Sequence, residues 1–293
     1  MAEVATSTTS EQLLVVVDPV ARRSDGESVR IAKDVLGAGA GMKLCLPDGP
    51  EEFARALARR GSRRPVVVGD DRALLRAVAL LHRHRELAGC ALSVVPVGGA
   101  LSLARSLGVP TGTVAAARAV LDGVERRMDL MVDDSDGVVL GALRIPPLSP
   151  SPVGAGPPAA PDPGHPPGHP WLRTCQSLVR TLVPVPRPSR LAAAPEPGPS
   201  RLRVEVDGET LVDLNQPVEA VSVSPSAAGI ASVEIRPVSV GAEASPLLAE
   251  GRTVTVSGAH FRYRADTVVS GPVRTRTWVV REGAWGLTLP AGR

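Results

Sequence analysis

The sequence predicts an α/β domain with a parallel, nucleotide-binding-like sheet, followed by an all-β, sandwich-like domain. Three observations support this prediction. Short β-branched runs alternate with helical patterns over residues 13–145, proline-rich sequence occupies residues 146–200, and alternating strand patterns fill residues 201–293. Strand–helix alternation is typical of a parallel sheet covered by helices, whereas short strands between glycine and proline turns are typical of a β-sandwich.

The elements of the first domain follow in order. Residues 1–12 are expected to be disordered, and the first strand, 13–17, ends at Asp18-Pro19. A helix is predicted over 26–36, and the glycines of 37–41 that follow it indicate a helix end, because a dinucleotide fingerprint must follow a strand. The other strands are predicted at 42–47, 65–69, 91–99, 126–132 and 137–145, and the other helices at 49–61, 72–87, 100–108 and 113–123.

The second half begins with a linker. Residues 146–200 are rich in proline and have almost no hydrophobic periodicity, apart from one short amphipathic helix predicted near 171–183. From residue 201 onward, alternating runs such as "LRVEVDGETL" and "RTVTVSG" predict the β domain.

The composition fits a globular protein whose core consists of Val, Leu and Ala. Hydrophobic residues make up 43%, charged residues 22% and aromatic residues 2% of the 293 residues, and the net charge is +3. Because no long run of like charges occurs, a nucleic-acid partner is not expected. The three cysteines lie far apart, which argues against a disulfide framework or a zinc site. With no signal peptide and no membrane-spanning apolar stretch, we expect a cytoplasmic protein; peripheral association with a membrane stays open.

Three loops at strand ends carry the most specific motifs. The first strand ends in Asp18-Pro19, a later one in the turn Gly69-Asp70-Asp71-Arg72-Ala73, and a third in Pro96-Val97-Gly98-Gly99. "LGVP", an alanine-rich helix and then "MDL" follow. This order resembles the catalytic family of the diacylglycerol kinases, which includes bacterial soluble lipid kinases and shares its fold with NAD kinases. The resemblance covers about residues 13–135.

The resemblance implies transfer of the ATP γ-phosphate to a lipid hydroxyl, with Mg²⁺ neutralising the charge. It also implies a lipid or a membrane surface as a partner. The residues that it places at the nucleotide site are Asp18, Gly69, Asp71, Arg72, Gly98 and Gly99, and Asp71 is also a catalytic candidate. No further metal site is expected, and the oligomeric state stays open.

The first loop departs from the family pattern G-G-D-G-T, of which only Gly69 and Asp71 remain. A glycine loop binds phosphate because its N–H groups converge and no Cβ obstructs the anion. Asp70 places a carboxylate where the anion would lie, and Arg72 fills space that a glycine leaves open.

The family's acidic D-G-E motif near the C-terminus is also lost, since our alignment places Ser270-Gly271-Pro272 there. Neither Ser nor Pro can act as a carboxylate base. Asp207 and Glu209 are the other acidic candidates in the β domain, although their Asp-Gly pair also predicts a hairpin turn. We therefore expect a lipid kinase family protein with impaired or lost ATP-dependent phosphorylation. The alternatives are an active lipid kinase and a non-catalytic lipid- or protein-binding regulator.

Overall fold

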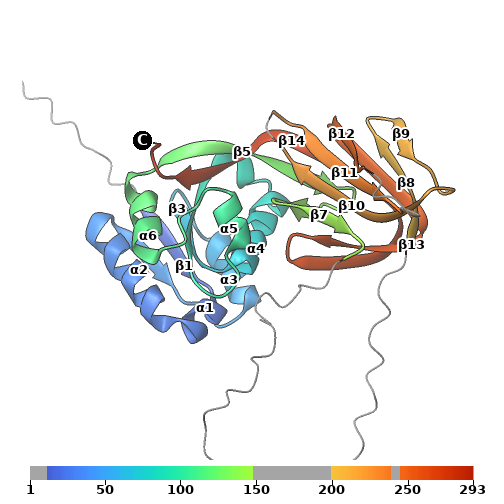
Figure 1. Ribbon diagram of the computed structural model, residues 1–293. Helices are drawn as coiled ribbons and strands as arrows, with labels where there is room; N and C mark the ends of the chain where they lie inside the picture. Colours follow the sequence, from blue (N-terminus) through green and yellow to red (C-terminus); the bar gives the residue numbers. More distant parts are fainter. Residues whose placement is uncertain (1–11, 148–198, 227, 239–244, 293) are drawn as a thin grey trace, which may run out of the picture. The chain divides into compact units, whose positions relative to one another are not determined.

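The computed structural model describes residues 12–147 and 199–292, apart from residue 227 and residues 239–244 (Figure 1). The expected disorder at the N-terminus falls on residues that lie outside this description, except for Gln12. Nearly all of the expected linker, with its short helix near 171–183, also lies outside the described residues. In the part that is described, no helix is long and apolar enough to cross a membrane.

Four parallel strands form the sheet of the N-terminal region, in the order β2, β1, β3, β4. They are β1 (Leu13–Val17), β2 (Met42–Cys45), β3 (Arg64–Gly69) and β4 (Ala91–Pro96). The strands β1, β3 and β4 are almost continuously buried runs of aliphatic residues. Such runs suit a parallel sheet, because helices cover both of its faces. The fold is therefore mixed α/β here, as predicted.

The helices divide between the two faces because successive strand residues point in opposite directions. On one face Val15 packs with residues of α1, α2 and α6, and on the other face Val16 packs with residues of α3, α4 and α5. The helices are α1 (Pro19–Ser24), α2 (Gly26–Gly39), α3 (Pro50–Ala58), α4 (Asp71–Arg83), α5 (Ser102–Ser106) and α6 (Thr113–Asp122), with a 3₁₀ turn η1 at Leu87–Gly89.

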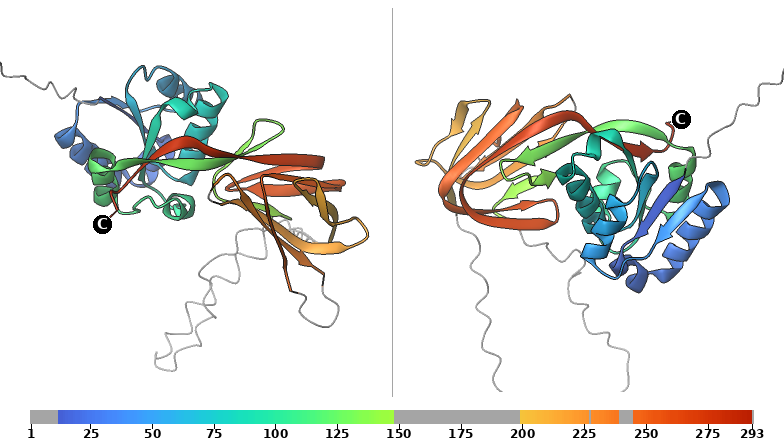
Figure 2. Two further views of the ribbon diagram at one scale, coloured as in Figure 1. Left: turned by 90° about the horizontal axis from the view of Figure 1, so that it is seen from above. Right: turned by 180° about the vertical axis from the view of Figure 1, so that it is seen from behind.

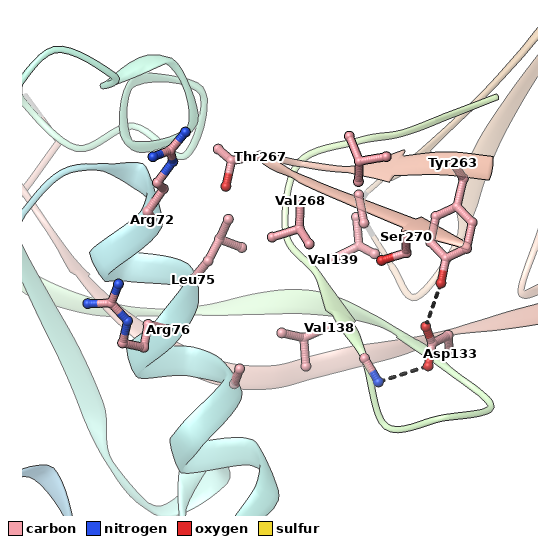
Figure 3. A pocket seen from close by; sticks show the side chains of 14 residues that line it. Arg72, Leu75, Arg76, Asp133, Val138, Val139, Tyr263, Thr267, Val268 and Ser270 are labelled. Atoms are coloured by element: carbon pink, nitrogen blue, oxygen red, sulfur yellow. Dashed lines mark hydrogen bonds between the residues drawn. The ribbon is translucent and has the colours of Figure 1, made fainter. Parts of the chain in front are cut away.

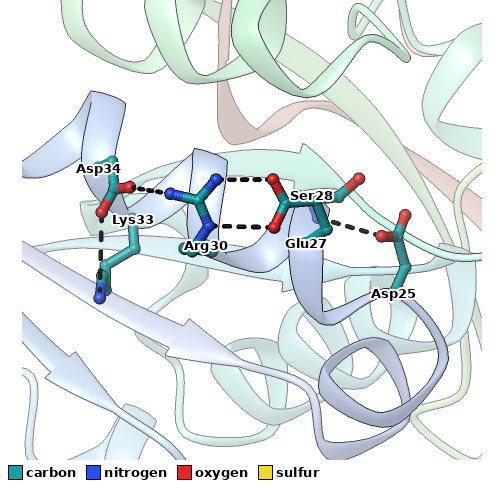
Figure 4. Close-up of polar contacts among 6 residues, drawn as sticks. All are labelled: Asp25, Glu27, Ser28, Arg30, Lys33 and Asp34. Carbon is teal, nitrogen blue, oxygen red and sulfur yellow. Dashed lines mark hydrogen bonds and ion pairs between the residues drawn. The ribbon is translucent and has the colours of Figure 1, made fainter.

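Helix α2 shows how this chain caps and charges an exposed helix (Figure 4). The side chain of Asp25 accepts a hydrogen bond from the Ser28 N–H, 3.0 Å away, at the start of the helix. Hydrogen bonds from the hydroxyl and the backbone of Ser28 lower the pKa of Asp25. Arg30 then forms ion pairs with Glu27 and Asp34. Exposed pairs of this kind contribute little to stability, so the cap is the more important feature.

The C-terminal region is rich in sheet and has its own core, which includes the fully buried Trp278. Seven of its strands are β8 (Ser200–Val206), β9 (Glu209–Val212), β10 (Pro217–Pro225), β11 (Ala231–Pro237), β12 (Leu247–Gly251), β13 (Thr253–Ala265) and β14 (Val268–Leu289). Three more strands, β5 (Val124–Asp133), β6 (Val138–Val139) and β7 (Leu143–Ile145), precede residue 148.

Strand pairing does not follow the boundaries expected at residues 145 and 201. Strand β7 pairs with β10 and β13, so it belongs to the sheet-rich region. The 22-residue strand β14 returns to the other sheet, where it pairs in parallel with β4 and antiparallel with β5 (Figure 2, red). The reason is burial, since Trp285 and Leu287 pack in the same core as Leu92. One hydrogen-bonded path therefore runs from β12 to β2.

Candidate functional site

The loops that follow β1, β3 and β4 meet at the carboxyl edge of the parallel strands, where open α/β sheets bind ligands. The backbone N–H of Asp18 donates to the Val68 carbonyl, and the N–H of Asp71 donates to the Ala100 carbonyl. An N–H of the third loop donates to the carbonyl of Gly69. The structure thus brings together the predicted nucleotide-site residues Asp18, Gly69, Asp71, Arg72, Gly98 and Gly99.

Gly69 lies where the chain has no room for a side chain. A Cβ at this position would lie 2.7 Å from the Cβ of Ala73 and 2.9 Å from the Cβ of Asp18. Gly98 has a φ of +124°, a conformation that favours glycine, whereas nothing lies within 4 Å of a Cβ at Gly99. The requirement for glycine at position 69 is therefore explained by packing, independently of any ligand.

Asp70 caps helix α4 in the way that Asp25 caps α2. Its Oδ1 accepts hydrogen bonds from the N–H groups of Arg72, at 3.0 Å, and Ala73, at 3.1 Å. These are the helix-terminal donors that a phosphate in this turn would need. A nucleotide phosphate would have to displace the Asp70 carboxylate and then remain beside its negative charge. The turn does not fit the phosphates of ATP.

Asp71 is fully buried, with both of its carboxylate oxygens bonded. Oδ1 accepts from the N–H of Ala104, and Oδ2 accepts from the N–H of Leu103 and the hydroxyl of Ser102, at 2.9 to 3.2 Å. Asp71 therefore joins the start of α4 to the start of α5. Its acceptor positions serve structure, which leaves little capacity for a role as a general base.

Asp18 is satisfied within the protein as well. One oxygen accepts from the N–H of Val20 at the start of α1, and the other accepts from the Arg76 guanidinium at 2.7 Å. Arg76 also lies over the ring of Phe53, with its Cζ 5.5 Å from the ring centroid. Arg72, in contrast, is exposed, and it has no ion pair among the described residues.

The acidic candidates of the β region lie elsewhere. Asp207 and Gly208 have φ values of +50° and +89° in the turn between β8 and β9, so the Asp-Gly pair does form a hairpin turn. The Asp207 carboxylate accepts from the N–H groups of Arg252 and Thr253. Glu209 follows it as an exposed residue of β9. Figure 1 shows this hairpin well away from α4 and α5, so the structure does not bring Asp207 and Glu209 to Asp71.

Asp266 is an acidic residue that the sequence reasoning missed. It occupies the turn between β13 and β14 and accepts hydrogen bonds from the N–H groups of Leu140, Gly141 and Ala142. Burial raises the pKa of Asp266, and the negative charge of Asp71 adds to the rise, although the three N–H donors oppose it. Asp266 lines a cavity of about 440 Å³. An Asp between two strand patterns is the sequence signal that could have located this turn, because Asp tolerates a positive φ, which is +50° here.

A second cavity, of about 590 Å³, lies between α4 and the β13–β14 hairpin (Figure 3). Figure 3 shows Arg72 and Thr267 at one end of this cavity, and Tyr263 and Asp133 at another. The Tyr263 hydroxyl donates to an oxygen of Asp133, 3.3 Å away. Ser270 also lines this cavity. The aliphatic lining consists of Leu75, Ala79, Val138, Val139, Ala265, Val268 and Val269.

Within the described ranges, no group of three or more His, Cys, Asp or Glu side chains is placed to hold a metal ion. The carboxylates of Asp18, Asp70 and Asp71 at the carboxyl edge instead bond to backbone N–H groups or to arginine. The local chemistry is that of capped helices beside two cavities, one with a mainly aliphatic lining and one with a polar lining.

Comparison with known proteins agrees with this fold. Residues 12–132 match the model of the family described as diacylglycerol kinase catalytic domain, so the resemblance carried by the sequence motifs is confirmed. No curated protein matches the chain by sequence.

Solved structures extend the likeness in fold beyond those residues. One is a crystal structure of a diacylglycerol kinase from Bacillus anthracis str. Sterne, with 12% identity, a TM-score of 0.64, and coverage of 96% of this chain and 98% of that chain. A second, from the same strain and of a protein assigned as a diacylglycerol kinase, has 12% identity, a TM-score of 0.66 and the same coverage. Since these identities are low, the likeness concerns the fold.

Proposed function

We propose that this diacylglycerol-kinase-like protein has impaired or lost ATP-dependent phosphorylation of lipids. The observation that supports the proposal is the bonding of the α4 turn. Asp70 uses the N–H groups of Arg72 and Ala73, and Asp71 uses its own oxygens to hold α5. The turn therefore offers no free cluster of donors to a phosphate.

Electrostatic repulsion also disfavours binding of a triphosphate in this turn. Two unit charges 4 Å apart interact by about 1 kcal/mol in water and by about 4 kcal/mol near a protein surface. A triphosphate in this turn would lie against the carboxylate of Asp70, with Asp71 next to it in the chain. The exposed guanidinium of Arg72 offsets part of this repulsion but does not restore the two occupied N–H groups.

The direct test uses the purified full chain with Mg-ATP. We expect no heat of binding in calorimetry at millimolar ATP, no upward shift of the unfolding midpoint, and no transfer of phosphate to diacylglycerol in mixed micelles. An active diacylglycerol kinase assayed in parallel verifies the substrate and the conditions. Robust phosphorylation of diacylglycerol by this chain would contradict the proposal.

The alternative of an active lipid kinase is favoured by Asp266. Carboxyl groups whose pKa is raised by burial within a cavity are typical of general acids and bases. Asp266 has this property, and the negative charge of Asp71 contributes to its raised pKa. If the chain does phosphorylate lipid, Asp266→Asn should abolish most of the activity, whereas Asp207→Asn, in the β8–β9 turn, should leave it unchanged.

A non-catalytic role in lipid binding is supported by the 590 Å³ cavity. This volume lies in the range of small-ligand pockets, which are mostly apolar with a few polar groups. Val268 and Val269 are 54% and 46% exposed, although they are large and apolar. We expect Val268→Asp to weaken uptake of a fluorescent fatty acid by the full chain. Leu248→Asp, at a residue that is 74% exposed on β12, is the matched control and should not weaken it.

A further inference from the structure

Two arginines face each other beside the polar cavity. Arg144 on β7 and Arg264 on β13 are directly opposite residues of an antiparallel pair, and both line the 440 Å³ cavity. Directly opposite residues of such a pair lie on the same face of the sheet with their Cβ atoms about 5 Å apart. Two positive charges are thereby held close together on one wall.

This arrangement is costly unless something compensates it, because like charges on directly opposite residues destabilise a sheet. Neither arginine has an ion pair among the described residues, and the Nε of Arg264 is buried without a hydrogen-bond partner. Some other arginines of the region are compensated, since Arg203, Arg236 and Arg276 each pair with a carboxylate.

The remaining polar groups of the cavity are already engaged. Asp266 accepts three backbone hydrogen bonds, the Ser102 hydroxyl donates to Asp71, and the Ser106 hydroxyl donates to a carbonyl in its own helix. The donors that these bonds leave available are the two guanidinium groups and the hydroxyl of Thr267, which also lines the cavity. The complementary ligand is an anion with several acceptor oxygens.

We infer that Arg144 and Arg264 form a phosphate-binding site. Guanidinium groups bind phosphate through paired N–H donors, and two of them match the dianionic charge of a phosphate monoester. The phosphate can be free in solution or can belong to a lipid headgroup. Thr267 lines both cavities, so a lipid with its phosphate at the arginines has the apolar cavity beside it. The lining of this cavity includes no residue of the turn 69–73, and the inference does not depend on loss of lipid phosphorylation.

The experiment uses the full chain and two probes, inorganic phosphate in calorimetry and sedimentation with phosphatidylcholine vesicles that contain phosphatidic acid. We expect the double variant Arg144→Ala/Arg264→Ala to lower the affinity for each probe that binds the wild type by about tenfold or more, because two charge-assisted contacts are lost. Arg118→Ala, at an exposed residue of α6, is the charge control and should change neither. The unfolding midpoint of the double variant should not fall, since a repulsion is removed.

The outcomes distinguish free phosphate from a lipid headgroup as the ligand. Binding of both probes, lost in the double variant, supports the site and shows that phosphate alone is recognised. Binding of the vesicles alone, lost in the double variant, supports the site with a lipid headgroup as the ligand. Binding that the double variant retains, or the failure of both probes to bind the wild type, would overturn the inference. Pure phosphatidylcholine vesicles serve as the uncharged reference.

Discussion

The turn at the start of α4 and the arginine pair on β7 and β13 differ in whether their charged groups have partners within the protein. In the turn, the carboxylates of Asp70 and Asp71 are bonded to the protein's own N–H groups. At the strand pair, Arg144 and Arg264 face each other with no carboxylate partner in the described part of the chain. The difference supports the proposal that internal bonds close the turn to phosphate, whereas positive charge is available at another place.

The comparison also separates structural roles from ligand-binding roles. A residue whose polar atoms are all bonded within the protein should affect stability when it is changed, and a residue without partners should affect binding. The following variants test this separation.

The largest expected effect is that of Asp71→Ala. The change leaves the buried N–H groups of Leu103 and Ala104 without acceptors, so we expect the free energy of unfolding to fall by about 3 kcal/mol or more. Asp71→Asn, which keeps one acceptor oxygen, should lose less. Urea denaturation measures both. An Asp71→Ala protein as stable as the wild type would show that the carboxylate is not structural.

The next largest loss of stability is expected for Gly69→Ala. The new Cβ would lie 2.7 Å from the Cβ of Ala73, and overpacking of this kind costs about 1–3 kcal/mol. Gly99→Ala is the matched control, because nothing lies within 4 Å of a Cβ there, and it should be close to neutral. Thermal unfolding of the two variants gives the comparison. Equal midpoints would mean that position 69 tolerates a side chain.

Asp70 tests whether the cap excludes phosphate. Loss of the cap in Asp70→Ala should lower the free energy of unfolding by about 1 kcal/mol, whereas Asp70→Gly should lower it by only a few tenths of that. Asp70→Gly should also bind Mg-ATP more tightly than Asp70→Asn, which keeps an acceptor in the cap position. Calorimetry measures this difference. If all three variants bind Mg-ATP as the wild type does, the carboxylate does not block the turn.

Asp266 should make stability depend on pH in a way that is opposite to that of most carboxylates. Its pKa is raised in the folded state, so the protein binds more protons when folded than when unfolded between the two pKa values. Its contribution to stability is therefore complete below the unfolded pKa, about 3.9, and is lost as the pH rises through the raised folded pKa. The stability of the wild type relative to Asp266→Asn should decline over that pH window. A constant difference in unfolding midpoint would contradict the raised pKa.

The smallest effect is expected for Arg30→Ala on α2. Its two ion pairs are exposed and screened by solvent, so the unfolding midpoint should stay within experimental error of the wild type. A clear loss of stability would mean that surface charge matters more in this chain than its buried caps, which would weaken the comparison of the two regions.

Local patterns in the sequence predicted much of the fold. The runs of valine after residue 12 and at 65–69 are strands, and the alanine- and leucine-rich segments between them are helices, because burial on both faces leaves a clear pattern. The return of β14 to β4 was not predicted, since it depends on contacts between distant residues. For example, the hydroxyls of Ser93 and Thr288 are hydrogen-bonded across 195 positions of the chain.

The candidate site was also predicted only in part, because local motifs do not reveal contacts between distant residues. Motif order placed Asp18, Gly69 and Asp71 near one another, and the structure brings them together. The order of the motifs could not show that the Asp70 carboxylate caps α4, because an Asp before a helix is compatible with both a cap and an open loop. Asp266 was missed because its proximity to Asp71 arises from the β13–β14 turn, far along the chain.

The most direct test of the account is the backbone amide spectrum of isotopically labelled full chain, recorded by NMR while inorganic phosphate is added. The account predicts that the amide signals of Arg144 and Arg264 move with added phosphate, while those of Arg72 and Ala73, which donate to Asp70, stay in place. Movement of the Arg72 and Ala73 signals, with no change at Arg144 and Arg264, would show that the α4 turn still binds phosphate and would contradict the account.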